Sequence, residues 1–191
     1  MRDDGIERLR EILGPRKDVI VQGWLERTLR TYPEQTSRFL GQERDRFRNP
    51  VGHTFKVALP ALFEGLLADG DPSEFAPLLD GIVRIRAVQD FGAGQAVGFL
   101  FLLKRVVREA LAAEADGDPP GEGLTALEDR IDEMALLAFD LFMRCRERLY
   151  EVRTNEARRQ LSFLQRRCGA TAPAAAPGLP GVTAAGWSGQ G

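Results

Sequence analysis

Apolar residues between positions 4 and 168 recur at spacings of three and four, separated by breaks at glycine and proline. Such spacing places apolar side chains on one face of an α-helix, and the period of two that marks half-buried strands is almost absent. The pattern predicts helices over residues 4–13, 17–31, 55–66, 71–89, 95–115 and 124–168, with a further helix that begins near Pro33. The predicted fold class is therefore all-α.

The last predicted helix, from Leu124 to Cys168, is unusually long. At about 1.5 Å per residue its 45 residues extend roughly 67 Å, whereas a domain of this size is about 40 Å across. We therefore expect this helix to overhang the rest of the domain.

Apolar residues in this helix alternate spacings of four and three, which is typical of the seam between two paired helices. Because a domain that ends earlier leaves the later members uncovered, we expect a homodimer. The predicted dimer seam consists of Leu127, Ile131, Met134, Ala138, Leu141, Cys145, Leu149 and Val152.

Charge is unevenly distributed along the same helix: acidic residues dominate up to Asp140 and arginines dominate from Leu141 to Arg167. This order opposes the helix dipole favourably at both ends. The basic half is either a solvated helix face or a docking surface for an acidic partner or for nucleic acid. The docking residues would be Arg153, Arg158, Arg159, Arg166 and Arg167.

The chain as a whole has 191 residues and a net charge of −2, which fits one domain and is too small to attract nucleic acid or anionic lipid. We expect a helical domain over 1–168 and a disordered Pro/Gly/Ala-rich tail over 169–191, unless Leu179 and Trp187 in the tail bind a partner. Two cysteines form no disulfide framework, and no segment predicts a signal peptide or a membrane span, so we expect a cytoplasmic protein with no membrane insertion.

The sequence offers few groups for catalysis or metal binding. His53 is the single histidine, so a triad or a multi-histidine metal site has no second imidazole, and a structural or capping role is favoured. No Glu-x-x-His pair and no phosphate-binding glycine loop is present. We expect a protein that is not an enzyme and has no cofactor or metal.

Residues 82–91 bring polar side chains into an apolar helical pattern. Two interpretations stay open: the polar groups line a small cavity, or Asp90 pairs with an arginine and fixes a corner of the fold. The residues concerned are Arg84, Arg86, Gln89, Asp90 and Gln95.

Several stretches between Val19 and Arg159 form a recognisable series. They are Asn49-Pro50-Val51-Gly52, Ile85-Arg86-Ala87-Val88-Gln89-Asp90-Phe91 leading into Gln95-Ala96-Val97-Gly98-Phe99, Leu102-Leu103-Lys104, Arg130-Ile131-Asp132 and Cys145-Arg146-Glu147. Together they resemble the N-terminal domain of RsbR-type RsbT co-antagonist proteins. The resemblance implies a globin-like helical sensory domain without haem that dimerises and is joined by a long exit helix to a STAS domain within a stressosome.

This sequence departs from that plan in two places. No strand-and-helix alternation of STAS type follows Cys168, so we expect a stand-alone domain. Gly92-Ala93-Gly94 stands where the family often has serine-rich capping chemistry, so we expect a looser corner there. The helices from Asp71 onward contain no histidine, which argues against a proximal haem ligand.

Two hypotheses of function follow. The first is a non-catalytic sensory or regulatory domain that signals through a dimeric long helix to a protein partner; any small-molecule ligand it senses is not identified by the sequence. The second is an adaptor or assembly subunit that docks a larger protein complex, for example a redox complex, through the basic half of the helix and the tail.

Overall fold

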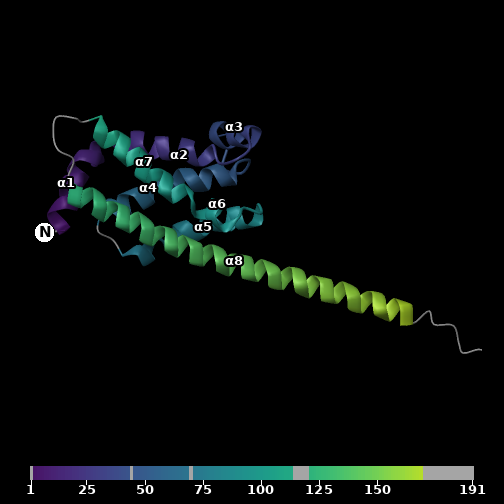
Figure 1. Cartoon of the computed structure of the whole chain (residues 1–191). Coiled ribbons are helices and arrows are strands. Elements are labelled where there is room, and N and C mark those ends of the chain that lie inside the picture. The colour runs from purple at the N-terminus through teal and green to yellow at the C-terminus, as the bar shows by residue number, and fades with distance from the viewer. Residues whose placement is uncertain (1, 44, 69–70, 114–120, 170–191) are drawn as a thin grey trace, which may run out of the picture. The chain divides into compact units, whose positions relative to one another are not determined.

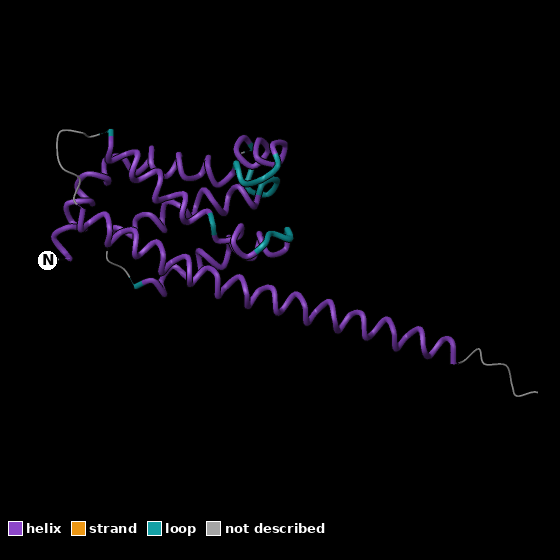
Figure 2. Tube along the Cα trace, viewed as in Figure 1, coloured by secondary structure: helices purple, strands orange, loops and turns teal. Residues whose placement is uncertain are grey.

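The computed structural model describes residues 2–43, 45–68, 71–113 and 121–169, and within these ranges every regular element is a helix (Figures 1 and 2). This confirms the predicted all-α class. The α-helices are α1 (Arg2–Leu13), α2 (Lys17–Leu29), α3 (Glu34–Gln42), α4 (Pro50–Leu67), α5 (Ala76–Val88), α6 (Ala93–Val97), α7 (Phe99–Ala112) and α8 (Gly121–Gly169). Two short 3-10 turns, η1 (Gly14–Arg16) and η2 (Pro72–Phe75), precede α2 and α5.

The chain divides into two units, Met1–Leu149 and Tyr150–Gly191. The first unit holds α1 to α7 and the first part of α8; in the second, the structure describes the remaining residues of α8 up to Gly169. The predicted tail therefore lies outside the described residues apart from Gly169, and the two predicted domain ranges stay a prediction.

The core of the first unit is built around α2, which packs against both α4 and α7, while α4 also packs against α5. Trp24 of α2 is fully buried and stacks on Phe99 of α7, with ring centroids 6.1 Å apart. Its indole N–H donates to the Phe99 carbonyl oxygen at 2.7 Å. The indole therefore buries its apolar body and still satisfies its one polar atom.

Asn49 explains where α4 begins. Its side-chain oxygen accepts the backbone N–H of Gly52 at 2.8 Å, and its amide nitrogen donates to the carbonyl oxygens of Leu40 and Glu43 at 2.9 and 3.0 Å. A Cβ at Gly52 would lie 2.5 Å from the Leu40 oxygen, so the close approach requires glycine. The Asn49-Pro50-Val51-Gly52 stretch thus caps α4 and ties it to the end of α3.

The prediction of one helix over residues 95–115 was wrong, because Gly98 separates α6 from α7. The Gly98 N–H donates to the Gly94 carbonyl oxygen at 2.9 Å, and a Cβ at Gly98 would lie 2.8 Å from that same oxygen. The chain therefore turns at a position where the close approach of the Gly94 carbonyl oxygen requires glycine.

The long final helix is confirmed, and it begins at Gly121 rather than at the predicted Leu124. The loop predicted over residues 116–121 lies outside the described residues except for Gly121. Within the part of the chain that the structure describes, no helix has the length and apolar character needed to cross a membrane.

Candidate functional site at the α5–α6 corner

Arg86, near the end of α5, is a charged side chain inside the apolar core. Its exposed fraction is 0%, and no carboxylate within the described ranges forms an ion pair with it. Burying a charge without an opposite charge costs several kcal/mol, since the lost hydration must be replaced by other polar contacts.

Those contacts come from three oxygen atoms. Arg86 Nη1 donates to the Gln95 carbonyl oxygen at 2.8 Å and lies 3.5 Å from that of Ala96. Nη2 donates to the Thr31 hydroxyl oxygen at 3.2 Å. Because the break at Gly98 removes the backbone N–H groups that would serve these two carbonyls in a continuous helix, Arg86 takes their place.

Four aromatic rings from different parts of the chain surround the guanidinium, and we call them the aromatic cage. The distances from Arg86 Cζ to the ring centroids are 5.4 Å for Tyr32, 5.5 Å for Phe55, 5.1 Å for Phe91 and 5.0 Å for Phe99. The negative faces of such rings attract a cation most strongly where water is excluded. The cage therefore offsets part of the cost of burying the charge.

The positive charge at this site is that of Arg86, and it interacts with the neighbouring Tyr32 hydroxyl. Burial lowers the pKa of Arg86, and the neighbouring Tyr32 opposes this shift in part; an arginine nevertheless stays charged in a protein. Burial also raises the pKa of Tyr32, with the charge of Arg86 acting in the opposite direction. Two buried polar atoms, Arg86 Nε and Tyr32 Oη, form no hydrogen bond within the described residues.

The structure separates the other predicted corner residues from this buried centre. Arg84 is exposed and pairs with Asp80 of the same helix at 3.0 Å. Gln89 is also exposed, and the exposed Gln95 uses its side-chain oxygen to accept the Gly92 N–H at 3.3 Å, which caps α6. Thus Arg86 and the backbone of Gln95 are brought together, whereas Arg84 and Gln89 lie apart from the cage.

Asp90 ends α5 in a left-handed conformation with φ of 59°. The Phe91 N–H donates to the Arg86 carbonyl oxygen at 3.1 Å, and the Asp90 N–H to that of Ala87 at 3.4 Å, which is the pattern of a Schellman cap. Aspartate tolerates this backbone region better than most residues. The corner that follows Arg86 therefore has a defined geometry.

Arg146 of α8 bonds to the same corner. Its Nη1 lies 3.3 Å from Asp90 Oδ1 and 3.5 Å from the Ala87 carbonyl oxygen. A cation at the end of a helix is favourable because the last carbonyl oxygens carry partial negative charge. The corner is thus also attached to α8, which runs past α5 in Figure 1.

The predicted dimer seam falls into two groups. The first four residues, Leu127, Ile131, Met134 and Ala138, have exposed fractions of at most 1% because the chain's own core covers them. These side chains have no surface left for a second copy. Leu141, Cys145 and Leu149 pack partly against the same core, and Val152 is 66% exposed.

The five arginines predicted for partner docking all lie on exposed positions of α8. Arg166 Nε donates to the Ser162 carbonyl oxygen at 3.2 Å, and the Arg167 guanidinium lies 5.9 Å from the Phe163 ring centroid. Their exposure is compatible with either interpretation of the basic half.

Residues with metal or nucleophile chemistry are dispersed. His53 is exposed on the first turn of α4, where its backbone N–H donates to the Asn49 carbonyl oxygen at 3.1 Å. Cys145 is a half-buried free thiol, and the side chain of Cys168 lies outside the described residues. No group of three or more histidine, cysteine, aspartate or glutamate side chains in the described ranges is arranged to hold a metal ion.

Comparison with known proteins identifies the family. Neither the curated proteins nor the solved structures gave a significant match. The family model described as "RsbT co-antagonist protein rsbRD N-terminal domain" matches residues 18–157, close to the range expected from the sequence motifs. Because this match covers most of the chain, the protein belongs to the rsbRD N-terminal domain family of RsbT co-antagonist proteins.

Proposed function

We propose that this protein is a non-catalytic, cytoplasmic sensory or regulatory domain in which a change at the Arg86 corner alters the pairing of α8 with a second copy. Membership of the rsbRD N-terminal domain family supports a stressosome-related regulatory role. The more specific proposal, that α8 transmits the signal, rests on one observation: Arg146 of α8 bonds to Asp90 and to the Ala87 carbonyl oxygen.

The corner is suited to this role because two arginines attach it to different parts of the fold. Arg86 binds the cage and the α6 carbonyl oxygens, and Arg146 attaches the end of α5 to α8. Arg86 is buried and its contacts are costly to rearrange, while the Arg146–Asp90 pair is partly exposed and individually weak. A shift of Arg86 would therefore move the α5 end and release or reposition Arg146.

A surface for the second copy lies on α7 and α8. We call it the α7/α8 face; it comprises the exposed residues Phe101, Leu136, Phe139 and Met143. The three α8 residues follow spacings of three and four, and Leu136 is 69% exposed. These residues replace the first half of the seam expected from sequence, since that half is already buried.

Two ion pairs show that Phe101 adjoins this row. Lys104 of α7 pairs with Asp132 of α8 at 2.7 Å, and Arg108 pairs with Glu128 at 2.7 Å, so the two helices run antiparallel here. Phe101 lies one turn before Lys104, and Leu136 lies one turn after Asp132. The four apolar residues therefore form one continuous row on two neighbouring helices.

The charges beside the row favour pairing with a second copy. The α7 side carries Lys104 and Arg105, and the α8 side carries Asp132 and Glu133. A two-fold axis along the row would set the α7 of one copy against the α8 of the other, which brings basic residues opposite acidic ones. Such an arrangement is self-complementary and keeps both α8 helices parallel.

Light scattering and sedimentation of the full chain test this pairing. We expect a dimer at protein concentrations on the order of tens of micromolar, and a monomer for Leu136→Glu, which places a charge in the row. Val57→Glu is the matched control, since Val57 is an exposed apolar residue of α4, and it should leave the dimer intact. A wild-type protein that stays monomeric at these concentrations would contradict the proposal.

The adaptor function remains the second candidate, and the exposed surface of residues 150–167 favours it. A hollow of about 540 Å³ there is lined by Glu156, Arg159, Gln160, Ser162, Phe163, Leu164 and Arg166, which combine apolar and basic character. Native mass spectrometry of the purified protein distinguishes the two functions. A stoichiometric protein partner that is lost in an Arg159→Glu, Arg166→Glu variant supports the adaptor function, whereas a homodimer that carries no other protein supports the sensory one.

A further inference from the structure

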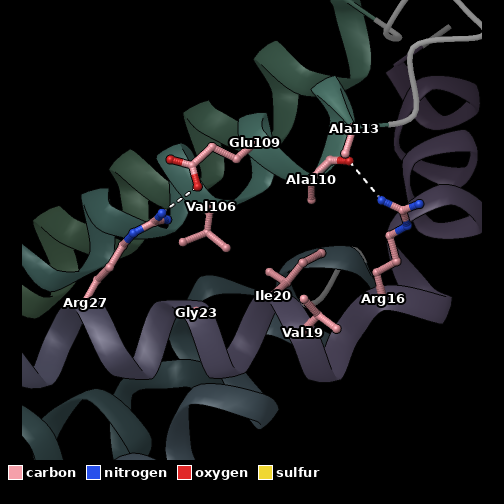
Figure 3. A pocket seen from close by; sticks show the side chains of 9 residues that line it. All are labelled: Arg16, Val19, Ile20, Gly23, Arg27, Val106, Glu109, Ala110 and Ala113. Atoms are coloured by element: carbon pink, nitrogen blue, oxygen red, sulfur yellow. Dashed lines mark hydrogen bonds and ion pairs between the residues drawn. The ribbon is translucent and has the colours of Figure 1, made fainter.

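A pocket lies between α2 and the second half of α7, and none of its lining residues belongs to the Arg86 corner (Figure 3). Its volume is about 380 Å³, which falls in the range of small-molecule sites. The α2 part of the lining extends from Val19 to Arg27, roughly 12 Å at about 1.5 Å per residue. Most of the lining is apolar, and the residues of this kind are Val19, Ile20, Gly23, Val106, Ala110 and Ala113.

The middle of the pocket has room for an apolar chain because Gly23 carries no side chain. A Cβ at this position would reach only ordinary contact with Val106 at 3.5 Å. The packing of α2 on α7 therefore does not require glycine here, and a longer side chain would occupy the pocket. Val19, which also lines the pocket, is 76% exposed. A bound apolar chain would remove this side chain from water, which is favourable.

Arg27 and Glu109 form the polar end of the pocket (Figure 3). Arg27 Nη2 donates to Glu109 Oε2 at 2.5 Å, whereas Arg27 Nη1 is buried and makes no hydrogen bond within the described residues. A buried donor without an acceptor is costly, because it has lost its hydration and has gained no partner. Since Arg27 lines the pocket, an oxygen atom of a bound molecule would supply the acceptor that Nη1 lacks.

The charges at this end favour an uncharged acceptor. Arg27 and Glu109 form an ion pair, so the guanidinium already has an opposite charge beside it. An anionic ligand would meet the Glu109 carboxylate, and a cationic ligand would meet the Arg27 guanidinium. A carbonyl oxygen accepts hydrogen bonds and donates none, so it fits a site whose missing partner is an acceptor.

We propose that this pocket binds an uncharged, straight-chain carbonyl compound. Its carbonyl oxygen accepts from Arg27 Nη1, and its apolar chain lies along Gly23 and Val106 towards Val19. At the other end of the pocket Arg16 Nη1 donates to the Ala110 carbonyl oxygen at 3.2 Å, and the ligand needs no contact with it. The site is independent of the proposed function, because binding requires neither dimerisation nor the Arg86 corner.

Isothermal titration of the full chain with 2-octanone tests the site. 2-Octanone should bind saturably with one-to-one stoichiometry and a Kd below about 1 mM, the weak limit of specific binding. Octanoate and octylammonium have the same number of carbon atoms and carry opposite charges. Each should bind at least about tenfold more weakly than 2-octanone, because each meets a like charge in the Arg27–Glu109 pair.

Two variants test the polar end. Arg27→Gln removes Nη1 and should weaken 2-octanone binding about tenfold, whereas Arg105→Gln, on the exposed side of α7, should leave it unchanged. Glu109→Gln keeps an acceptor for Arg27 Nη2 and removes the negative charge. Octanoate should then bind at least about tenfold more tightly than it binds the wild type, and 2-octanone should not. Glu74→Gln, at an exposed carboxylate of η2, should change neither affinity.

A further variant tests the apolar middle. Gly23→Leu fills the pocket and should abolish 2-octanone binding, whereas Gly94→Leu, at an exposed α6 glycine with open space around it, should not. Circular dichroism confirms folding, and Ala110→Leu is the second pocket-filling variant if Gly23→Leu unfolds.

The proposal is overturned by any of four results. These are no saturable binding of 2-octanone, equal or tighter binding of octanoate or octylammonium by the wild type, unchanged 2-octanone affinity in Arg27→Gln, and unchanged 2-octanone affinity in a folded pocket-filling variant. An octanoate affinity that Glu109→Gln leaves unchanged would overturn the charge argument and, with it, the choice of an uncharged ligand. None of these results bears on whether the chain dimerises through the α7/α8 face.

Discussion

Replacing Arg86 with methionine tests whether the buried guanidinium holds the α5–α6 corner. Methionine keeps the length and apolar volume of the side chain and removes its charge and its donors. The two hydrogen bonds of 2.8 and 3.2 Å would be lost, and each hydrogen bond to a charged group contributes about 1.5–3 kcal/mol. Four ring contacts at about 0.5–1 kcal/mol each add about 2–4 kcal/mol.

Relief of the desolvation cost opposes these losses by several kcal/mol. The net expectation for Arg86→Met is a loss of about 2–4 kcal/mol in the free energy of unfolding, or roughly 4–16 °C in Tm for a chain of this size. Urea unfolding followed by circular dichroism measures it. Arg84→Met, on an exposed turn of the same helix, is the control and should change stability by about 0.5 kcal/mol at most. An Arg86→Met protein as stable as the wild type would refute the reasoning.

Three further substitutions probe other parts of the fold. Because burial raises the folded-state pKa of Tyr32, its stabilising contribution is present below the unfolded pKa of about 10 and declines as pH rises above it. Urea unfolding at about pH 9 and about pH 11 should show that Tyr32→Phe loses less stability over this interval than the wild type; an equal loss would point to other groups. Asn49→Ala removes the cap and both amide hydrogen bonds and should cost about 2–4 kcal/mol in urea unfolding, with a smaller loss than about 1 kcal/mol contradicting the capping argument. Trp24→Phe removes the 2.7 Å bond to the Phe99 carbonyl oxygen and should lower the unfolding free energy by about 1–3 kcal/mol, whereas an unchanged value would show that this bond contributes nothing net.

The helical class and most helix positions were predictable from sequence because the apolar period is a local property. The spacing of Trp24, Leu25 and Thr28 on α2 directly gives its buried face. The break at Gly98 was missed because apolar residues continue on both sides of it, and a single glycine inside such a run does not show whether the helix stops.

The sequence predicted only some of the residues that form the α5–α6 corner. The polar residues of α5 marked the segment, but Arg86 was not distinguished from its neighbours, because no spacing links it to Thr31 and Tyr32, which follow α2, or to Phe55 on α4. A buried arginine and an exposed one such as Arg84 differ by two positions on the same helix, and only the tertiary packing of several helices distinguishes them.

The dimer seam shows a related limit. A spacing of four and three identifies an apolar stripe along α8, but it does not state what covers that stripe. The stripe of Leu127, Ile131 and Met134 is covered by the chain's own core, whereas Leu136 and Phe139, on another face of α8, are exposed.

The central claim is that the Arg86 corner controls α8 through Arg146, and distances between the α8 helices of two copies test it most directly. A spin label at position 160, introduced as Gln160→Cys with Cys145 and Cys168 changed to alanine, reports the separation of the two helices by pulsed electron paramagnetic resonance. The account predicts a defined distance between copies that shifts or broadens with Arg146→Gln and stays unchanged with the control Arg84→Gln. The account would be contradicted if no distance between the labels of two copies were measured. It would also be contradicted if the labelled parent, Arg146→Gln and Arg84→Gln all gave the same distance distribution.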